Sequence, residues 1–215
     1  MNRLKMLLLL SLLIISCCEV PPFKIFNLGE AKNAVQNYYE SGGFDDECSK
    51  VIDNAIKHIT KIKITEKSCV IFDIDETALS NYTYTKEIGF GYIYSLWVEW
   101  QKKAIAPAVK ATKNFYDYLI SKNIRVIFLT GRTSEVKEST NRNLIEQGYV
   151  RFDTLIVRTG NENKITSAEF KAKKREELVK NGYDIIACIG DQWSDLVGGN
   201  AGYKIKFPSY LYLID

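Results

Sequence analysis

Short apolar runs alternate with amphipathic stretches from residue 69 onward. The apolar runs, each three to five residues long, lie at residues 70–72, 126–129, 154–157 and 185–189. Each is typical of a strand buried on both faces, and the stretches between them carry apolar residues at helical spacing. This alternation predicts an α/β fold with a doubly wound parallel sheet, whose ligand site lies at the carboxyl ends of the strands.

Local signals mark the ends of the expected helices. Pro107 suits the first position of one helix, and a second is expected over residues 134–147, where Gly148 stops it. A third begins with the capping box formed by Thr166 and Glu169. Before the sheet, residues 29–63 carry helical periodicity that Gly42-Gly43 interrupts. We therefore expect two N-terminal helices beside the core.

An aromatic insert at about residues 80–106 breaks the alternation after the first strand. Its rings are Tyr82, Tyr84, Phe90, Tyr92, Tyr94, Trp97 and Trp100. They indicate a small helical cap, in which some rings form an apolar core and others line a substrate pocket. Tyr84 and Trp97 are the candidates for substrate contact.

The N-terminus is typical of an export signal. Arg3 and Lys5 precede an apolar run at residues 6–15, which is too short to span a membrane as a helix. The segment Ile14-Ile15-Ser16-Cys17 resembles a bacterial lipobox, with Cys17 as the lipidated residue. The alternative is an ordinary cleaved signal peptide, and either predicts export.

The chain is therefore expected to consist of a signal peptide (1–16), a lipid-anchored tether (17–28) and one α/β domain (29–215). The expected location is the outer membrane or cell surface, or otherwise the periplasm or the medium. The formal charge is +3, and loss of Arg3 and Lys5 would leave +1. A surface this close to neutral does not indicate binding to a nucleic acid polymer.

Polar motifs follow several of the expected strands in a fixed order. Asp73 and Asp75 follow the first strand, Thr130-Gly131-Arg132 the second, and Asp191 and Asp195 the fourth, while Lys171 lies early in the capped helix. Because parallel strands place their carboxyl ends at one edge, these groups should meet there. Clustered carboxylates need a cation between them, and their hard oxygen atoms select Mg²⁺. The set therefore predicts phosphoryl-transfer chemistry.

These motifs resemble those of the haloacid dehalogenase superfamily. The wording around Asp73 and the run Gly190-Asp191-Gln192-Trp193-Ser194-Asp195 are similar to the class B/C acid phosphatases, which include bacterial class C lipoproteins and plant vegetative-storage-type phosphatases. The resemblance implies a Mg²⁺-dependent phosphomonoesterase with a haloacid-dehalogenase-like Rossmannoid core. A small phosphomonoester is the expected substrate, with nucleoside 5′-monophosphates as one candidate class.

Site roles also follow from the resemblance. It implies that Asp73 is the nucleophile, Asp75 the acid and base, Thr130 a phosphate ligand beside Gly131, and Lys171 the counter-charge. The implied metal ligands are Asp73, the Asp75 carbonyl, Asp191 and Asp195. Three neighbouring lysines compete with Lys171 for its role: Lys164, Lys173 and Lys174.

Several alternatives remain open on the sequence. Trp193, two residues after Asp191, is a further candidate for substrate contact, whereas Arg132 and Arg175 are expected at the surface or in supporting roles. A non-catalytic storage protein of the same fold is one rival function. A phosphotransferase that uses alcohol acceptors is another, because both enzymes share the aspartyl-phosphate.

Overall fold

A five-stranded parallel sheet forms the centre of the protein. The structure is a computed structural model that describes residues 27–214. The strands are β1 (Ser68–Phe72), β2 (Arg125–Thr133), β3 (Thr154–Arg158), β4 (Asp184–Gly190) and β5 (Tyr203–Lys206). Their order in the sheet is β3-β2-β1-β4-β5, and every neighbouring pair is parallel. The predicted α/β fold is confirmed, with β5 as an edge strand that the hydrophobic pattern did not reveal.

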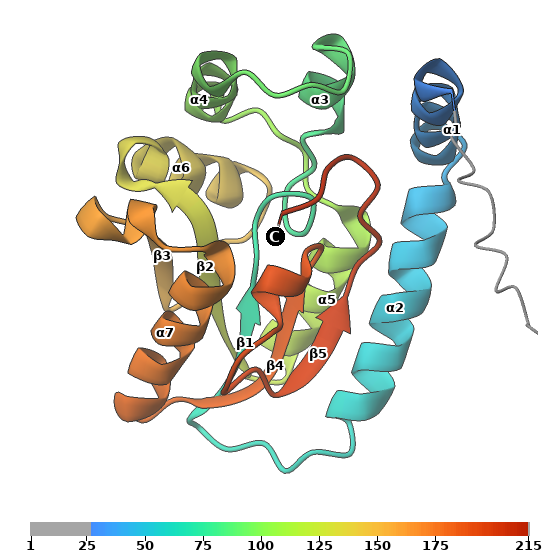
Figure 1. The fold of residues 1–215 in the computed structure, drawn as a ribbon. Coiled ribbons are helices and arrows are strands. Elements are labelled where there is room, and N and C mark those ends of the chain that lie inside the picture. The colour runs from blue at the N-terminus through green and yellow to red at the C-terminus, as the bar shows by residue number, and fades with distance from the viewer. Residues whose placement is uncertain (1–26, 215) are drawn as a thin grey trace, which may run out of the picture.

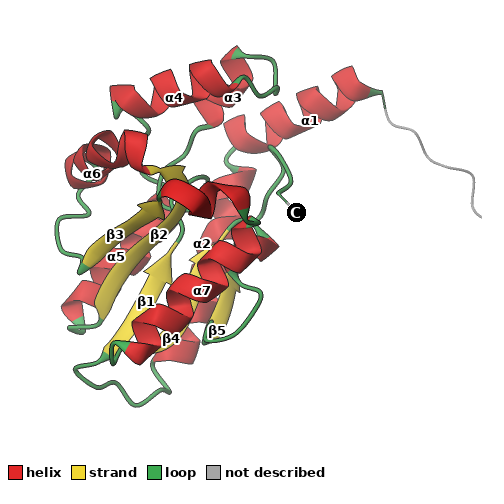
Figure 2. Ribbon diagram, turned by 60° about the vertical axis from the view of Figure 1, so that its left-hand side comes forward, coloured by secondary structure: helices red, strands yellow, loops and turns green. Residues whose placement is uncertain are grey.

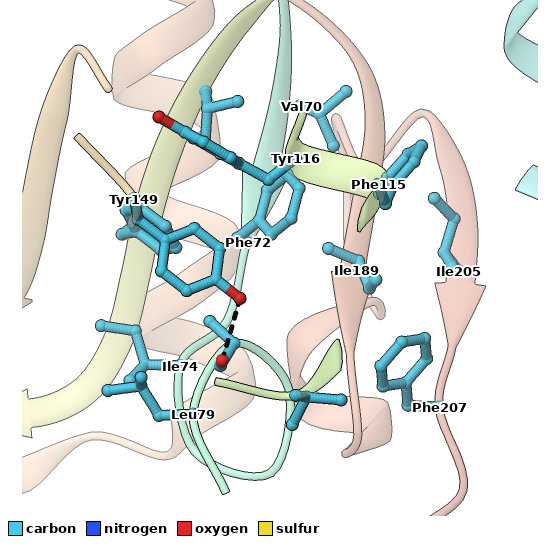
Figure 3. Close-up of a cluster of buried hydrophobic side chains, with 14 of the residues drawn as sticks. Val70, Phe72, Ile74, Leu79, Phe115, Tyr116, Tyr149, Ile189, Ile205 and Phe207 are labelled. Carbon is cyan, nitrogen blue, oxygen red and sulfur yellow. Dashed lines mark hydrogen bonds between the residues drawn. The ribbon is translucent and has the colours of Figure 1, made fainter. Parts of the chain in front are cut away.

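Helices cover both faces of this sheet (Figures 1 and 2). On one face lie α2 (Gly43–Ile59) and α5 (Lys110–Ser121), and on the other α7 (Ser167–Lys180). Phe72 and Phe128 point toward the first face and contact each other at 5.8 Å between ring centroids. Figure 3 shows this cluster, in which the Tyr149 hydroxyl donates to the Ala78 carbonyl at 3.0 Å. That bond ties the chain after β1 to the core.

Most of the expected helix boundaries are confirmed. The Thr166 and Glu169 capping box opens α7, and α6 (Lys137–Glu146) follows a 3₁₀ turn (η1, Ser134–Val136) and ends before Gly148. The helix start at Pro107 is wrong, because α5 begins only at Lys110. The Pro107 carbonyl instead accepts a hydrogen bond from Ser80 N at 2.8 Å, in the connection that leads to α5.

The aromatic insert forms two helices above the carboxyl edge of the sheet (Figure 1). They are α3 (Tyr82–Glu87) and α4 (Tyr94–Lys103). The N-terminal α1 (Leu28–Glu40) lies beside them, where Glu40 accepts hydrogen bonds from the Tyr82 hydroxyl at 2.9 Å and Lys86 Nζ at 2.5 Å. The expected cap is therefore present, and α1 is hydrogen-bonded to it.

Part of the N-terminal prediction lies outside the described residues. The signal peptide, Cys17 and nearly all of the tether fall there. Among residues 27–214, no helix is long and apolar enough to cross a membrane.

Candidate active site

Three aspartates from two neighbouring strands meet at the carboxyl edge of the sheet. Asp73 follows β1, and Asp191 and Asp195 follow β4. One ligand atom of each lies within 4.8 Å of the others, and all three residues are buried. Asp195 reaches this position because Gly190 has no side chain: a Cβ there would lie 2.1 Å from Asp195 Oδ2. The predicted clustering of these carboxylates is thus seen in the structure.

Lys171 provides the positive charge of this cluster. Its Nζ lies 2.5 Å from Asp73 Oδ1 and 2.5 Å from Asp195 Oδ1. Burial alone would lower the pKa of Lys171, but the two carboxylates outweigh burial and raise it above its usual value. Of the competing lysines, Lys174 pairs with glutamates, and Lys164 and Lys173 are exposed. The structure therefore brings Lys171, and not these three, to Asp73.

One lysine does not neutralise three carboxylates. Burial raises the pKa of Asp73 to about 7, and the nearby Asp195 and Asp75 add to the rise while Lys171 opposes it. Burial and the charges of Asp195 and Asp73 also raise the pKa of Asp191 well above its usual value. A divalent cation between these oxygen atoms would remove that repulsion. The donor set and its buried excess of negative charge fit Mg²⁺.

Asp75 faces a second group of partners. Arg132 Nη2 lies 2.6 Å from Asp75 Oδ1, and Arg132 Nε lies 3.1 and 3.2 Å from the two carboxylate oxygens. Asn81 Nδ2 donates to Asp75 Oδ1 at 2.9 Å, and it is fixed by Trp100 Nε1, which donates to Asn81 Oδ1 at 2.8 Å. The Arg132 side chain is 1% exposed, so it supports the site and is not a surface residue.

Arg175 is also buried and supporting. Its guanidinium donates to the carbonyls of Asp195, Val197 and Gly199, in the turn that follows β4. These bonds fix the backbone that carries Asp195. The surface alternative is therefore wrong for Arg175 as well.

Glu76 is buried near Asp75 and Asp191, and no sequence motif assigned it a role. It adopts a left-handed conformation with φ 56°, and its Oε1 accepts a hydrogen bond from Asn81 N at 2.6 Å. Its Oε2 is buried and has no hydrogen-bond partner among the described residues. Burial raises the pKa of Glu76 to about 8. The only sequence signal for it was a third acidic residue next to Asp75.

A cavity of about 580 Å³ opens beside these groups. It is lined by Asp73, Asp75, Lys171 and Asp191 on one side, and by Tyr84 and Trp97 from the cap. Its size suits a small organic ligand. The cap rings expected to contact substrate do reach the cavity.

The remaining expected contacts lie in different surroundings. Gly131 lines the cavity, whereas Thr130 is fully buried and its Oγ1 accepts a hydrogen bond from Arg132 N at 3.2 Å. Trp193 is 58% exposed and does not line the cavity in the described part of the chain. Lys206 Nζ lies 5.7 Å from the centre of its ring. The expectation that Trp193 contacts substrate is therefore corrected.

Residues near the end of the chain also reach the site, which the sequence did not indicate. Ser209 Oγ donates to Asp191 Oδ2 at 3.0 Å, and Gln192 Nε2 donates to the same atom at 2.6 Å. Leu211 and Tyr212 line the cavity. The acidic site is thus closed on one side by the chain that follows β5.

A parallel α/β sheet with a cap and a buried cluster of aspartates and lysine at its carboxyl edge defines the haloacid-dehalogenase class. Residues 17–215 match the family described as HAD superfamily, subfamily IIIB (Acid phosphatase). The chain belongs to this family, and its enzyme class, a hydrolase of phosphate monoesters, is confirmed.

Curated relatives agree with this assignment, and a solved structure shares the fold. The chain is 34% identical to the stem 28 kDa glycoprotein of Glycine max over 86% of this chain and 75% of the relative. It is 30% identical to acid phosphatase 1 of Solanum lycopersicum over the same shares. The fold matches the class C acid phosphatase of Bacillus anthracis with a TM-score of 0.70 at 23% identity, over 86% of each chain.

Proposed function

We propose that this protein is a Mg²⁺-dependent phosphomonoesterase that works through an aspartyl-phosphate on Asp73. One observation carries the proposal: Asp73 stands at the end of β1, lines the cavity and pairs with Lys171 inside a buried group of aspartates. Phosphoryl transfer to a carboxylate needs an oxygen nucleophile with its counter-charge held in place.

In the first step, a carboxylate oxygen of Asp73 forms a bond to phosphorus as the ester oxygen leaves. Asp75 gives its proton to that oxygen, so the product departs as an alcohol. In the second step, Asp75 takes a proton from water, whose oxygen attacks phosphorus and releases Asp73 and inorganic phosphate. Arg132 and Asn81 aim Asp75 for both steps.

The residues that would hold Mg²⁺ are Asp73, Asp191 and Asp195, together with the Asp75 carbonyl. When bound, the cation offsets the negative charge of the phosphoryl group. Lys171 contributes a further positive charge next to Asp73 and Asp195.

The proposed substrates are nucleoside 5′-monophosphates. Tyr84 and Trp97 line the cavity and contact each other at 5.3 Å between ring centroids. Aromatic rings beside a phosphate site can stack on a base, which contributes about 1–3 kcal/mol per base. A phosphate site alone would not use such rings.

We also propose that the protein is exported and anchored through a lipid on Cys17. The support is the order of features at the N-terminus: basic residues come first, an apolar run follows, and Ser16-Cys17 comes last. Export agrees with the Glycine max relative being named a glycoprotein, because glycosylation acts on secreted chains. Mass spectrometry of the exported protein tests the anchor: an unmodified N-terminus beyond Cys18 would contradict it.

The proposed reaction is tested with Asp73→Asn, which removes the nucleophilic oxygen but keeps the shape. We expect the folded variant to lose phosphate release from p-nitrophenyl phosphate. EDTA should abolish the activity of the wild type and Mg²⁺ should restore it. Turnover by Asp73→Asn, after mass spectrometry has excluded deamidation, would rule out Asp73 as the nucleophile.

A further inference from the structure

The segment at residues 208–214 turns back over the carboxyl edge of the sheet after β5 (Figure 1). Gln192 holds it at two points. Gln192 Nε2 donates to Ser209 Oγ at 2.6 Å, and Ile214 N donates to Gln192 Oε1 at 3.1 Å. A single side chain therefore fixes both ends of the segment against the turn that follows β4.

The same bonds reach Asp191, which is 1% exposed. An amide group has two donor hydrogens, and the Gln192 amide points them at Asp191 Oδ2 and Ser209 Oγ, each at 2.6 Å. Ser209 Oγ accepts one of them, and its own hydrogen can go to Asp191 Oδ2 at 3.0 Å or to the Tyr212 carbonyl at 3.2 Å. The charged carboxylate is the stronger acceptor of the two. Both donors end on Oδ2, and Oδ1 receives no hydrogen bond from the described residues.

The segment also forms a wall of the cavity. Leu211, Tyr212, Leu213 and Ile214 line it together with the aspartates and the cap rings. Burial and the charges of Asp191 and Glu76 raise the pKa of Tyr212, in keeping with a ring placed beside the carboxylates. Leu213 is 79% exposed, so core packing does not hold the last part of this apolar stretch in place.

We propose that segment 208–214 contributes to metal binding at this site. Gln192 and Ser209 are positioning residues: they orient Asp191 so that Oδ1 is available to the cation, and they hold the segment as one side of the substrate cavity. The inference rests on the proposed function, because it assumes that the aspartates bind a metal.

The test measures Mg²⁺ affinity by calorimetry on the full chain, without substrate. Loss of a group that orients a metal ligand costs about 10- to 100-fold in affinity. We expect Gln192→Ala and Ser209→Ala to raise the Mg²⁺ Kd by that factor, whereas Ser209→Thr keeps the hydroxyl and the Kd. The matched controls are Gln36→Ala and Ser121→Ala, which remove exposed side-chain hydrogen bonds of residues that do not line the cavity.

A second pair of variants leaves Gln192 and Asp191 unchanged. Ile214→Pro removes the N–H that binds Gln192, and Ile214→Ala retains it. Ile214 is 43% exposed and is not a core residue, so neither change removes core packing. Loss of one hydrogen bond predicts a Kd about two- to tenfold higher for Ile214→Pro than for Ile214→Ala.

The outcomes separate the inference from the proposed function. If the wild type binds Mg²⁺ and the Gln192, Ser209 and Ile214→Pro variants bind it equally well, the positioning role is wrong and the proposed reaction stands. An equal loss of affinity in Ser209→Thr and Ser209→Ala would also overturn it, since packing and not the hydroxyl would then be responsible. A wild type that binds no Mg²⁺ would overturn both.

Discussion

Arg132 and Asn81 hold Asp75 from two sides, and only the folded chain shows it. Arg132 lies 57 positions after Asp75 in the sequence, and its guanidinium is fixed in turn by Thr140 Oγ1, 3.0 Å from Nη1. The sequence predicted which aspartates would gather, because they follow strands that end at one edge. It could not predict which side chains would aim them, because those contacts depend on rotamers and on packing between distant segments.

Replacing Arg132 with lysine tests whether Arg132 orients the Asp75 carboxylate. Lysine keeps the charge but cannot form the forked contact that a guanidinium makes with a carboxylate. We expect kcat to fall more for alkyl phosphates, which need a proton for their leaving group, than for p-nitrophenyl phosphate. Steady-state kinetics with both substrates gives the comparison.

The matched control is Arg142→Lys, at an exposed arginine whose Nε lies 4.0 Å from Glu146. It should leave both rates unchanged. If Arg132→Lys lowers kcat equally for the two substrates, a role through Asp75 is contradicted and a general defect of the site is indicated.

Among the elements, those with strong local signals were predicted and those built by tertiary contact were not. Strands β1 to β4 each contain a continuous apolar run, and α7 begins with a capping box. Strand β5 is short, with Tyr203 and Lys206 partly exposed at the sheet edge, and its place depends on pairing with β4. Segment 208–214 has no periodicity at all, and it is fixed by side-chain bonds to Gln192.

Two tryptophans of the cap have different surroundings. In α4, Trp100 is bonded to Asn81, whereas Trp97 lines the cavity. We expect Trp97→Ala to reduce the preference for adenosine monophosphate over glycerol phosphate, mainly through KM, because stacking acts on ground and transition states alike. A stacking contribution of about 1–3 kcal/mol corresponds to roughly a five- to 150-fold change in kcat/KM.

Leu96→Ala is the control for this prediction, since Leu96 lies on the same helix and does not line the cavity in the described chain. The Leu96→Ala variant should prefer adenosine monophosphate over glycerol phosphate to the same extent as the wild type. If the wild type cleaves the two substrates with equal kcat/KM, the rings serve the cap alone and the nucleotide assignment is wrong.

At the scale of the whole molecule, the buried acidic site links stability to pH. Burial raises the pKa of Asp73 to about 7 and that of Glu76 to about 8. Between the unfolded pKa values near 4 and these folded values, the metal-free folded state binds more protons than the unfolded chain. The free energy of unfolding without metal should therefore decrease as the pH rises from about 4 to 8.

Mg²⁺ should reverse this trend, because metal binding requires deprotonated carboxylates. We expect the increase in Tm produced by Mg²⁺ over EDTA to grow from pH 5 to pH 8, and to shrink at every pH in Asp191→Asn. Calorimetric melting in both conditions measures it. A Mg²⁺ effect that is independent of pH would contradict the placement of the cation among these carboxylates.

The covalent step on Asp73 can be observed directly in the Asp75→Asn variant. p-Nitrophenol leaves without a proton donor, whereas attack by water on the phosphoenzyme needs the Asp75 base, so the intermediate should accumulate. Acid quenching followed by peptide mass spectrometry is the measurement. We predict one phosphoryl group per chain, on Asp73; a phosphoryl group on another side chain, or steady turnover with no phosphorylated peptide, would contradict the mechanism.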